Sequence, residues 1–408
     1  MGFINTTVFI APICYQDMDT FTAALHTDDR WSQIHSEELA TAYLISYAQC
    51  LLTDQKRYRG YWLRMPDRLD VCMFNKTGAH IAQVRLSCFG TGTGFMEFFV
   101  HYDGAMTVED IADFSYLFKK ASRADSPSRD THGWKGQSLY DTILELLPKN
   151  SVCQPFFTST AAFKRECYCF HAIKTVPEAV TAEHLSLLKR SYSTDFQSGT
   201  TGDSRYDMTY VPYLYDMWGG SQEALVNLCY APENPQTKRF IEDYKYGQLM
   251  NDYLFCYLLL LDQRFSMIRH IQQIAQVDEP TAKQMQQINE AIVRLKTGYA
   301  FRVISDDMIY QNVYSRMYDI LDVDHLMEDV QDSEAQLAMI RDIRALQVER
   351  DTNHVLSAIS LLSLFSALID AASYFDRFGV LGQLSTLLSL GCVVAIGTFC
   401  IAWIIRHR

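Results

Sequence analysis

The sequence lacks the short motifs that mark common enzymes. It contains no Gly-x-Ser-x-Gly, no His-Glu-x-x-His and no paired-carboxylate spacing. Its eleven cysteines are scattered from Cys14 to Cys400, and the closest pair, Cys167 and Cys169, has neither the C-x-x-C spacing nor the second ligand pair of a zinc site. We therefore expect a protein that is not an enzyme, with reduced and mostly buried thiols and no cofactor fixed by the sequence.

Positive charge is also scarce. The chain has 36 Lys and Arg against 48 Asp and Glu, which gives a formal net charge of -12. A nucleic-acid-binding surface normally shows a basic face, so nucleic acid is not an expected partner. No charged region, apolar region and cleavage site of a secretory signal stand at Met1. We expect the bulk of the protein to be cytosolic.

Proline is absent from the C-terminal part of the sequence: none of the ten prolines follows Pro280. Helix is therefore expected to dominate from there onward. Asn234 followed by Pro235 is a helix-start signal, since the asparagine can cap the helix and proline loses nothing at the first helical position. A long helix should run from there to about Gln276. The sequence Asp278-Glu279-Pro280 should end it and start another.

Residues 1–233 have a different pattern, in which short β-branched and aromatic runs alternate irregularly with helical spacing. The runs that read as strands are 7–11, 69–74, 80–86, 95–100 and 167–173, and those that read as helices are 108–122, 137–147 and 182–192. Irregular order of the two kinds predicts an α/β domain with a mixed sheet. We expect this cytosolic domain in residues 1–233, a helical hairpin and stalk in 234–350, and a two-helix transmembrane region in 351–408.

The predicted stalk is long. If its final helix starts near Ser305 and runs through Phe375, it extends on the order of 100 Å at 1.5 Å per residue. Gly298 or Ser305-Asp306-Asp307 could break the helical region, so one helix and two both remain open. Apolar residues recur along it at the spacing of a helix bundle, namely Ile320, Val323, Met327, Val330 and Leu337. Self-association is therefore predicted.

Two apolar segments, Val355 to Phe375 and Val380 to Ile405, follow the stalk. A hydrocarbon core about 30 Å thick needs roughly 20 helical residues, so both are predicted to span a membrane as a hairpin. Basic residues flank the pair on its two outer sides, at Arg341, Arg344, Arg350, Arg406 and Arg408. The positive-inside rule then places both termini in the cytosol and the protein in the inner (plasma) membrane as a multi-pass protein.

The first segment has a polar arc. Leucines, Ile369 and Phe365 fall on one side of a helical wheel, and serines with Asp370 fall opposite. Polar groups at membrane depth normally face a bundle interior or water, which predicts a pore, whereas serines alone could also serve close helix packing. The predicted pore-lining residues are Asn353, Ser357, Ser360, Ser363, Ser366, Ala367, Asp370, Ser373 and Tyr374.

This layout resembles the CorA family: a cytosolic α/β domain, a long stalk helix that enters the first of two C-terminal spans, a very short connector and a basic end. That family has Gly-Met-Asn between a tyrosine and usually a phenylalanine. The chain matches these flanks with Tyr374 and Phe378 but has Phe375, Asp376 and Arg377 between them. The resemblance implies a homopentamer with these three residues at the outer mouth. The departure puts magnesium uptake in doubt, because a ring of arginines repels cations.

An acidic run lies on the predicted stalk without any Lys or Arg. The ordinary interpretation is a solvated helix face. By resemblance to CorA-like proteins, the run would instead sense cations between subunits. The residues concerned are Asp319, Asp322, Glu328, Asp329 and Asp332.

Three signals for a ligand are weak. Gly90-Thr-Gly-Thr-Gly94 lies between two predicted strands and lacks a following Lys-Ser/Thr, so it indicates a hairpin loop rather than a phosphate cradle. Trp134 and Lys135 precede a predicted helix start, where an anion would be favoured, although an ordinary capped helix explains them too. Trp218 is predicted to lie at a turn beside an aromatic stretch, where it could stack on a ligand or belong to the core.

The sequence-based hypothesis is a ligand-gated CorA-like ion channel. CorA-like proteins without Gly-Met-Asn also occur as membrane effectors beside type III CRISPR systems, and an adenine-containing nucleotide second messenger would then be the activator. The alternatives are a magnesium, zinc or cobalt transporter of the CorA type and a membrane-anchored scaffold without a pore. Magnesium and a nucleotide are the two candidate ligands. The expected partners are further copies of the chain and the lipid bilayer.

Overall fold

A computed structural model describes most of the chain. The described residues are 2–35, 43–64, 69–70, 78–121, 143, 145–149, 153–156, 167–190, 206–275 and 281–376. By the contacts within the chain, these and the remaining residues divide into two compact units, Met1–Glu334 and Ala335–Arg408. The first unit holds the sheet and most helices, and the second begins inside the last described helix. The predicted three-part division of the chain stays a prediction.

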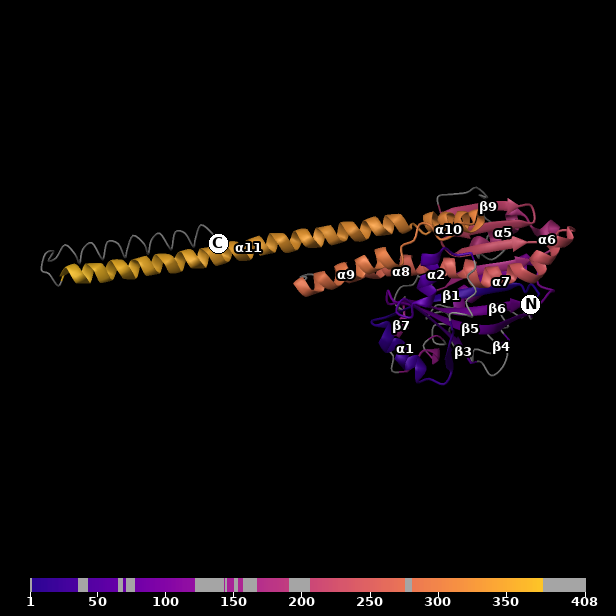
Figure 1. The fold of residues 1–408 in the computed structure, drawn as a ribbon, viewed down its shortest axis with the longest axis horizontal. Coiled ribbons are helices and arrows are strands. Elements are labelled where there is room, and N and C mark those ends of the chain that lie inside the picture. The colour runs from indigo at the N-terminus through magenta and orange to yellow at the C-terminus, as the bar shows by residue number, and fades with distance from the viewer. Residues whose placement is uncertain are drawn as a thin grey trace. The chain divides into compact units, whose positions relative to one another are not determined.

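One 11-stranded sheet forms the centre of the first unit (Figure 1). Its main path runs β2-β3-β5-β6-β1-β8-β11-β10-β9, with β4 paired to β5 and β7 paired to β1. The pairs are antiparallel except β8 with β11, which is parallel, so the predicted mixed sheet is confirmed. The strands are β1 Thr6–Tyr15, β2 Trp31–Gln33, β3 Tyr58–Leu63, β4 Leu69–Asp70, β5 Ala79–Phe89, β6 Thr93–Tyr102, β7 Cys153–Pro155, β8 Tyr168–Lys174, β9 Asp207–Tyr213, β10 Asp216–Ser221 and β11 Ala224–Cys229.

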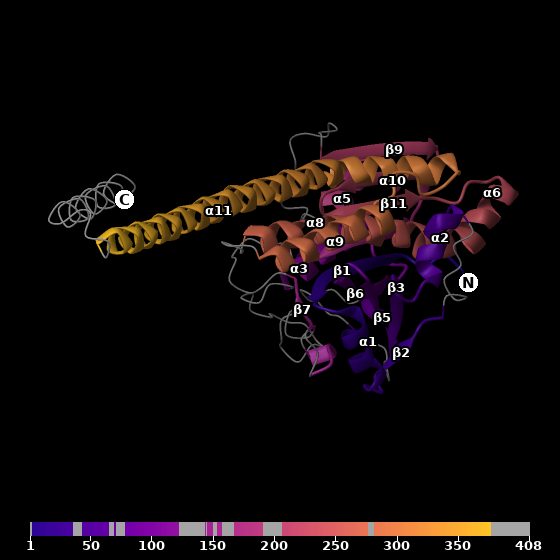
Figure 2. The ribbon, with the colours of Figure 1, turned by 60° about the vertical axis from the view of Figure 1, so that its left-hand side comes forward.

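Helices cover both faces of the sheet (Figure 2). Their bounds are α1 Met18–His26, α2 Ser46–Thr53, α3 Val108–Ala121, η2 Pro177–Ala179, α5 Ala182–Arg190, α6 Pro235–Arg239, η3 Phe240–Lys245, α7 Tyr246–Gln248, η4 Leu249–Tyr253, α8 Leu254–Ala275, α9 Ala282–Gly298, α10 Met308–Ile320 and α11 Val323–Asp376. The elements η3 and η4 are π-helical, and η2 is a 3₁₀ turn. A layer on each face explains why nearly all of β1 is buried, because only a strand covered on both sides reads as continuous apolar sequence.

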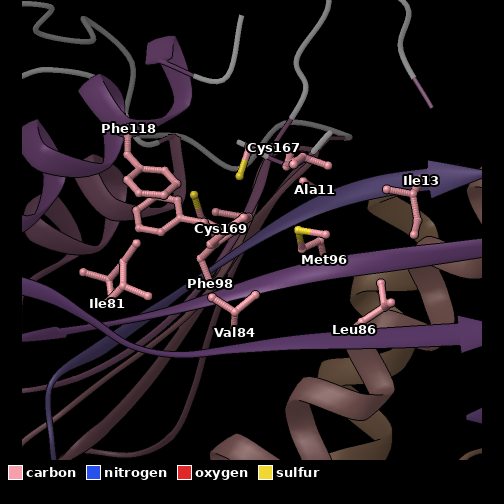
Figure 3. Packing of buried hydrophobic residues seen from close by; sticks show 14 of the residues in the cluster. Ala11, Ile13, Ile81, Val84, Leu86, Met96, Phe98, Phe118, Cys167 and Cys169 are labelled. Atoms are coloured by element: carbon pink, nitrogen blue, oxygen red, sulfur yellow. The ribbon is translucent and has the colours of Figure 1, made fainter. Parts of the chain in front are cut away.

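One hydrophobic core lies between the sheet and the layer that contains α1, α3 and α5. Phe9 of β1 stacks on Phe118 of α3 with ring centroids 3.9 Å apart, and Phe98 of β6 packs against the same ring. Figure 3 shows Phe98 and Phe118 together beside Ile81 and Cys169. Burial of rings this large supplies much of the hydrophobic free energy of folding.

The opposite face is covered by α8, with α9 beside it and α10 over β9 and β10. Phe265 of α8 packs edge-on against Phe95 and Tyr168 of the sheet. Tyr257 of the same helix packs on Phe170. This layer fixes α8 against the end of the β5–β6 hairpin, and the candidate site lies there.

The helix predicted after Asn234 is confirmed. The Asn234 side chain accepts hydrogen bonds from the backbone N–H groups of Gln236 and Thr237, and Pro235 occupies the first helical position. Helical backbone then continues to Ala275 through the two π-helical segments. Each π segment inserts extra backbone within a helix and is frequent at functional sites.

The sequence leaves the number of helices after Pro280 open, and a single helix from Ser305 to Phe375 does not form. The backbone is interrupted at Leu321 and Asp322, and α11 starts at Val323. Asp322 has a left-handed backbone with a φ of 56°. Such a conformation costs a non-glycine residue roughly 1–2 kcal/mol, and aspartate tolerates it better than most. The sequence carries no glycine or proline at this point, which is why the spacing alone did not reveal the break.

The prediction of two transmembrane helices is wrong. Within the described residues, no helix is both long enough and apolar enough to cross a membrane. The first proposed span belongs to α11, where serines recur among the leucines and a stretch rich in Arg, Asp and Glu precedes them. The second proposed span, Val380 to Ile405, and the connector from Arg377 lie outside the described residues.

Candidate anion-binding pocket

The predicted pore-lining residues are dispersed along α11. Asn353, the four serines from Ser357 to Ser366, Ala367 and Asp370 are exposed, as are Leu361 and Leu362 on the other side of the helix. The Ser363 hydroxyl donates to the Ile359 carbonyl of its own helix at 2.9 Å. For Ser373, Tyr374, Phe375 and Asp376 only the helical backbone is described, and Arg377 lies outside the described residues. Pore lining stays a prediction.

The acidic run surrounds the junction between α10 and α11. A hollow of about 340 Å³ there is lined by Asp319, Asp322, Glu328 and neighbouring residues, whereas Asp329 and Asp332 are exposed further along α11. Asp324 pairs with Arg302. No group of three or more His, Cys, Asp and Glu side chains is arranged to hold a metal ion within the part of the chain that the structure describes. Cation sensing by this run stays a prediction.

The three residues proposed to contact a ligand do not form a site. Trp134 and Lys135 lie outside the described residues. Trp218 was predicted at a turn, and this was wrong, because it lies inside strand β10 and is fully buried. Its ring packs on Tyr253 at 4.4 Å, and the Lys245 ammonium lies 5.8 Å from the ring centroid. The ring therefore belongs to the core.

A different set of residues forms a pocket of about 650 Å³ in the first unit. Its walls come from four places: the start of α1, the loop between α2 and β3, the β5–β6 turn, and the facing sides of α8 and α9. The volume lies within the range of small-molecule sites in proteins. The pocket is therefore large enough for a small organic ligand.

Four cationic side chains from three elements line this pocket. Lys56 and Arg57 come from the α2–β3 loop, Arg269 from α8 and Arg294 from α9. Arg57 pairs with Asp54, its Nε lying 3.3 Å from the carboxylate. Among the described residues, no carboxylate lies within ion-pair distance of Lys56, Arg269 or Arg294. Three cations are thus free to take an anionic ligand.

The acidic side chains of the pocket have their own partners. The Asp17 carboxylate caps α1 by accepting from the backbone N–H and the hydroxyl of Thr20, each at 2.7 Å. These hydrogen bonds lower the pKa of Asp17. Asp19 pairs with Arg59 outside the pocket lining. Among the described residues, Lys56, Arg269 and Arg294 without ion-pair partners thus outnumber the one such carboxylate, Asp17, and the pocket has a positive excess although the protein as a whole is acidic.

The β5–β6 turn supplies the floor, and the predicted hairpin at Gly90 to Gly94 is confirmed. Gly92 has a φ of +87°, and a Cβ there would lie 3.0 Å from the Tyr15 carbonyl. A Cβ on Gly90 would lie 2.6 Å from the Lys56 carbonyl. The N–H groups of both glycines donate to the Arg57 and Phe89 carbonyls, so they are not available to hold a phosphate. Anion binding would depend on the side chains.

Buried polar side chains hold this turn from below. The Asp262 carboxylate of α8 accepts hydrogen bonds from the hydroxyls of Thr91, at 2.6 Å, and Thr93. Arg269, two turns further along α8, donates to the Gly92 carbonyl. Burial raises the pKa of Asp262 to about 7, against the hydrogen bonds that favour its charged form. Desolvation likewise lowers the pKa of His270, so that ring contributes little positive charge to the pocket at neutral pH.

One face of α8 could have been recognised from the sequence. Asp262, Ser266, Arg269, His270 and Gln273 follow one another at helical spacings of four, three, one and three residues, which places them on one side of the helix. A polar face on a helix whose other sides are buried indicates a site, because buried polar groups need partners.

The comparisons with known proteins add no identification. No family model, curated protein or solved structure matches this chain. The resemblance to CorA-like proteins therefore stays a prediction that rests on the sequence pattern.

Proposed function

We propose that this protein is a receptor for a phosphate-bearing small molecule, and that the ligand binds in the pocket between the β5–β6 turn and helices α8 and α9. The single observation that carries the proposal is the convergence of Lys56, Arg269 and Arg294 from separate elements on one pocket without carboxylate partners. Long cationic side chains repel one another, and the convergence of three that have no ion-pair partner favours an anion site.

The chemistry of the three cations favours phosphate over carboxylate ligands. Arginine presents a planar fork that binds two oxygens of a phosphate at once, and lysine adds a point charge. Arg269 is also positioned by its hydrogen bond to Gly92, so less of its side-chain freedom is lost on binding. A nucleotide of the adenine-containing class predicted from the sequence satisfies these requirements. The positive pocket in a chain of net charge -12 would also concentrate anions locally.

In this proposal, ligand binding acts on the C-terminal helix α11. Most of the large apolar side chains that α11 exposes in a single chain lie beyond Glu334, among them Met339, Leu346 and Leu362. Self-association of this helix, predicted from the stalk spacing, would cover them. The homopentamer and ion conduction stay predictions from the resemblance. Because conduction depended on two membrane spans, it is not part of this proposal.

Thermal unfolding of the full chain with and without ligand tests the proposal. Millimolar ATP or inorganic tripolyphosphate should raise the melting temperature, and sulfate at equal ionic strength should not, since binding to the folded state alone stabilises it. Arg294→Gln should weaken this effect roughly tenfold in ligand concentration, as expected when one charge-assisted contact is lost. Lys296→Gln is the matched control, because it removes the same charge from an exposed position of α9 outside the pocket. Equal responses of the two variants would reject the site.

A further inference from the structure

The wall of the pocket continues directly into the segment that reaches the first turn of α11. This segment, residues 299–307, joins α9 to α10. Tyr299 at its start lines the pocket, and Arg302, three residues later, pairs with Asp324 of α11. We propose that this segment, hereafter the relay segment, transmits occupancy of the pocket to the junction between α10 and α11. The inference concerns the regulation of the proposed site and rests on the proposed function.

At the pocket end, the relay segment is fixed to the loop that carries two of the cations. The buried Tyr299 hydroxyl donates to the Arg57 carbonyl at 3.0 Å. The Gly90 N–H donates to the same carbonyl at 2.9 Å. A ligand that pulls Lys56 and Arg57 toward Arg294 would move this shared carbonyl and, with it, Tyr299. The position of Tyr299 therefore depends on the distance between the α2–β3 loop and α9 across the pocket.

The middle of the relay segment is tied to α10. The Phe301 carbonyl accepts a hydrogen bond from the Tyr314 hydroxyl at 2.7 Å. The Gln311 side chain donates to the Arg302 carbonyl and accepts from the Ile304 N–H, both at 2.9 Å. Each contact joins a different residue of the segment to the same helix. A displacement of the segment consequently reaches α10 as a whole.

The Arg302 side chain also contacts the first turn of α11. Its guanidinium pairs with Asp324 and lies 5.5 Å from the centroid of the Tyr318 ring. The Tyr318 hydroxyl in turn donates to the Asp324 carboxylate at 2.8 Å. The Arg302 side chain is 71% exposed, and exposed ion pairs contribute little stability. These contacts can therefore be broken and re-formed without unfolding the domain.

The junction that they bridge interrupts the right-handed helical backbone at a single residue. Asp322 holds a left-handed backbone between α10 and α11, and Arg264 of α8 donates to the preceding Leu321 carbonyl. In a right-handed conformation, Asp322 would join the two helices into one. A ligand shifts such an equilibrium only through its different affinity for the two states, and the movement of the relay segment supplies that difference. Because α8 also carries Arg269, the pocket has a second connection to this junction.

Hydrogen exchange of the full chain with and without ATP tests the relay. ATP should change the exchange of backbone amides in residues 318–328 of the wild type. Arg302→Gln should abolish this change and leave the ATP affinity within about twofold, because Arg302 does not line the pocket. Lys296→Gln should keep both binding and the exchange response.

A second variant addresses the junction itself. Asp322→Ala removes the residue type that tolerates the left-handed backbone and should slow exchange at residues 318–328 without ligand, as a continuous helix does. Two outcomes would refute the relay alone. Either the wild-type protein binds ATP and the hydrogen exchange of residues 318–328 does not change, or the Arg302→Gln variant keeps the full change. Failure of both ATP and tripolyphosphate to bind the wild type would refute the proposed function and the relay with it.

Discussion

The two compact units of the chain differ in how they treat their charged and apolar side chains. The sheet unit contains buried ion pairs, such as Arg85 with Glu97 and Lys189 with Asp207, and fully enclosed rings such as Trp218, beside exposed pairs such as Arg302 with Asp324. Along the described part of α11 beyond Glu334, an ion pair such as Arg341 with Asp342 is exposed, and so is the Leu362 side chain at 69%. The sheet unit encloses many large apolar side chains, whereas most of the described large apolar side chains of α11 beyond Glu334 are exposed.

In the proposed function, the sheet unit binds the ligand and the C-terminal helix responds to it. A pocket with positioned cations requires a rigid frame, which the sheet unit supplies through β5, β6 and α8. A signalling element requires contacts that can be exchanged, and exposed ion pairs such as Arg341 with Asp342 contribute little stability. The relay segment and its contact with Asp324 at the start of α11 both lie within the sheet unit.

The largest expected effect is on the free energy of unfolding, when a buried ion pair is broken instead of an exposed one. Glu97→Ala leaves the Arg85 guanidinium, 4% exposed, without the carboxylate that it contacts from Nε at 2.7 Å. Removing one partner of a buried pair typically costs about 3–5 kcal/mol. Asp342→Ala removes the partner of an exposed pair on α11 and should cost less than about 0.5 kcal/mol. Urea unfolding of the full chain measures both, and equal losses would contradict the division between the units.

The second effect is a pH dependence that originates under the pocket floor. Burial raises the pKa of Asp262 from its ordinary 3.8 to about 7, so the folded state holds this proton more tightly than the unfolded state. Its contribution to stability is full below about pH 4 and is lost as the pH rises toward 7. Burial also raises the pKa of Asp252 to about 7. This residue therefore also contributes stability that is lost as the pH rises.

Asp262→Asn tests this prediction because it removes the titrating carboxyl group and keeps the hydrogen bonds. The amide oxygen can still accept from the Thr91 and Thr93 hydroxyls. The variant should lose less stability than the wild type between pH 5 and pH 8, with a difference on the order of 2 kcal/mol. Urea unfolding at a series of pH values measures the difference. Identical slopes for wild type and variant would show that Asp262 is already charged in the folded state.

The sequence predicted the features that are local. Asn234 and Pro235 indicated a helix start through cap chemistry that acts within three residues, and the strand runs near Phe9 and Phe98 followed from their composition. The pocket depends instead on Lys56, Arg269 and Arg294, which are far apart in the chain. Only the tertiary fold brings them together, so spacing could not reveal them.

Two other failures have local causes. Trp218-Gly219-Gly220 has the composition of a turn, but Gly219 and Gly220 lie in β10, where a Cβ on Gly219 would lie 2.8 Å from the Leu185 side chain. The glycines thus permit close packing of helix on strand. The break at Asp322 occurs at a residue that helices tolerate, and the contacts of Arg264 and Arg302 around it come from other elements.

The central claim, that the pocket of the sheet unit binds a phosphate-bearing ligand, is tested most directly by isothermal titration of ATP into the full-length protein. We predict one site per chain in the wild type, and a loss of affinity of at least a hundredfold in the double variant Lys56→Glu, Arg294→Glu, since each reversal replaces an attraction by a repulsion. The control is Lys283→Glu, Lys296→Glu, which reverses two exposed charges of α9 outside the pocket and should keep the wild-type affinity. Equal affinity of the two double variants would contradict the account.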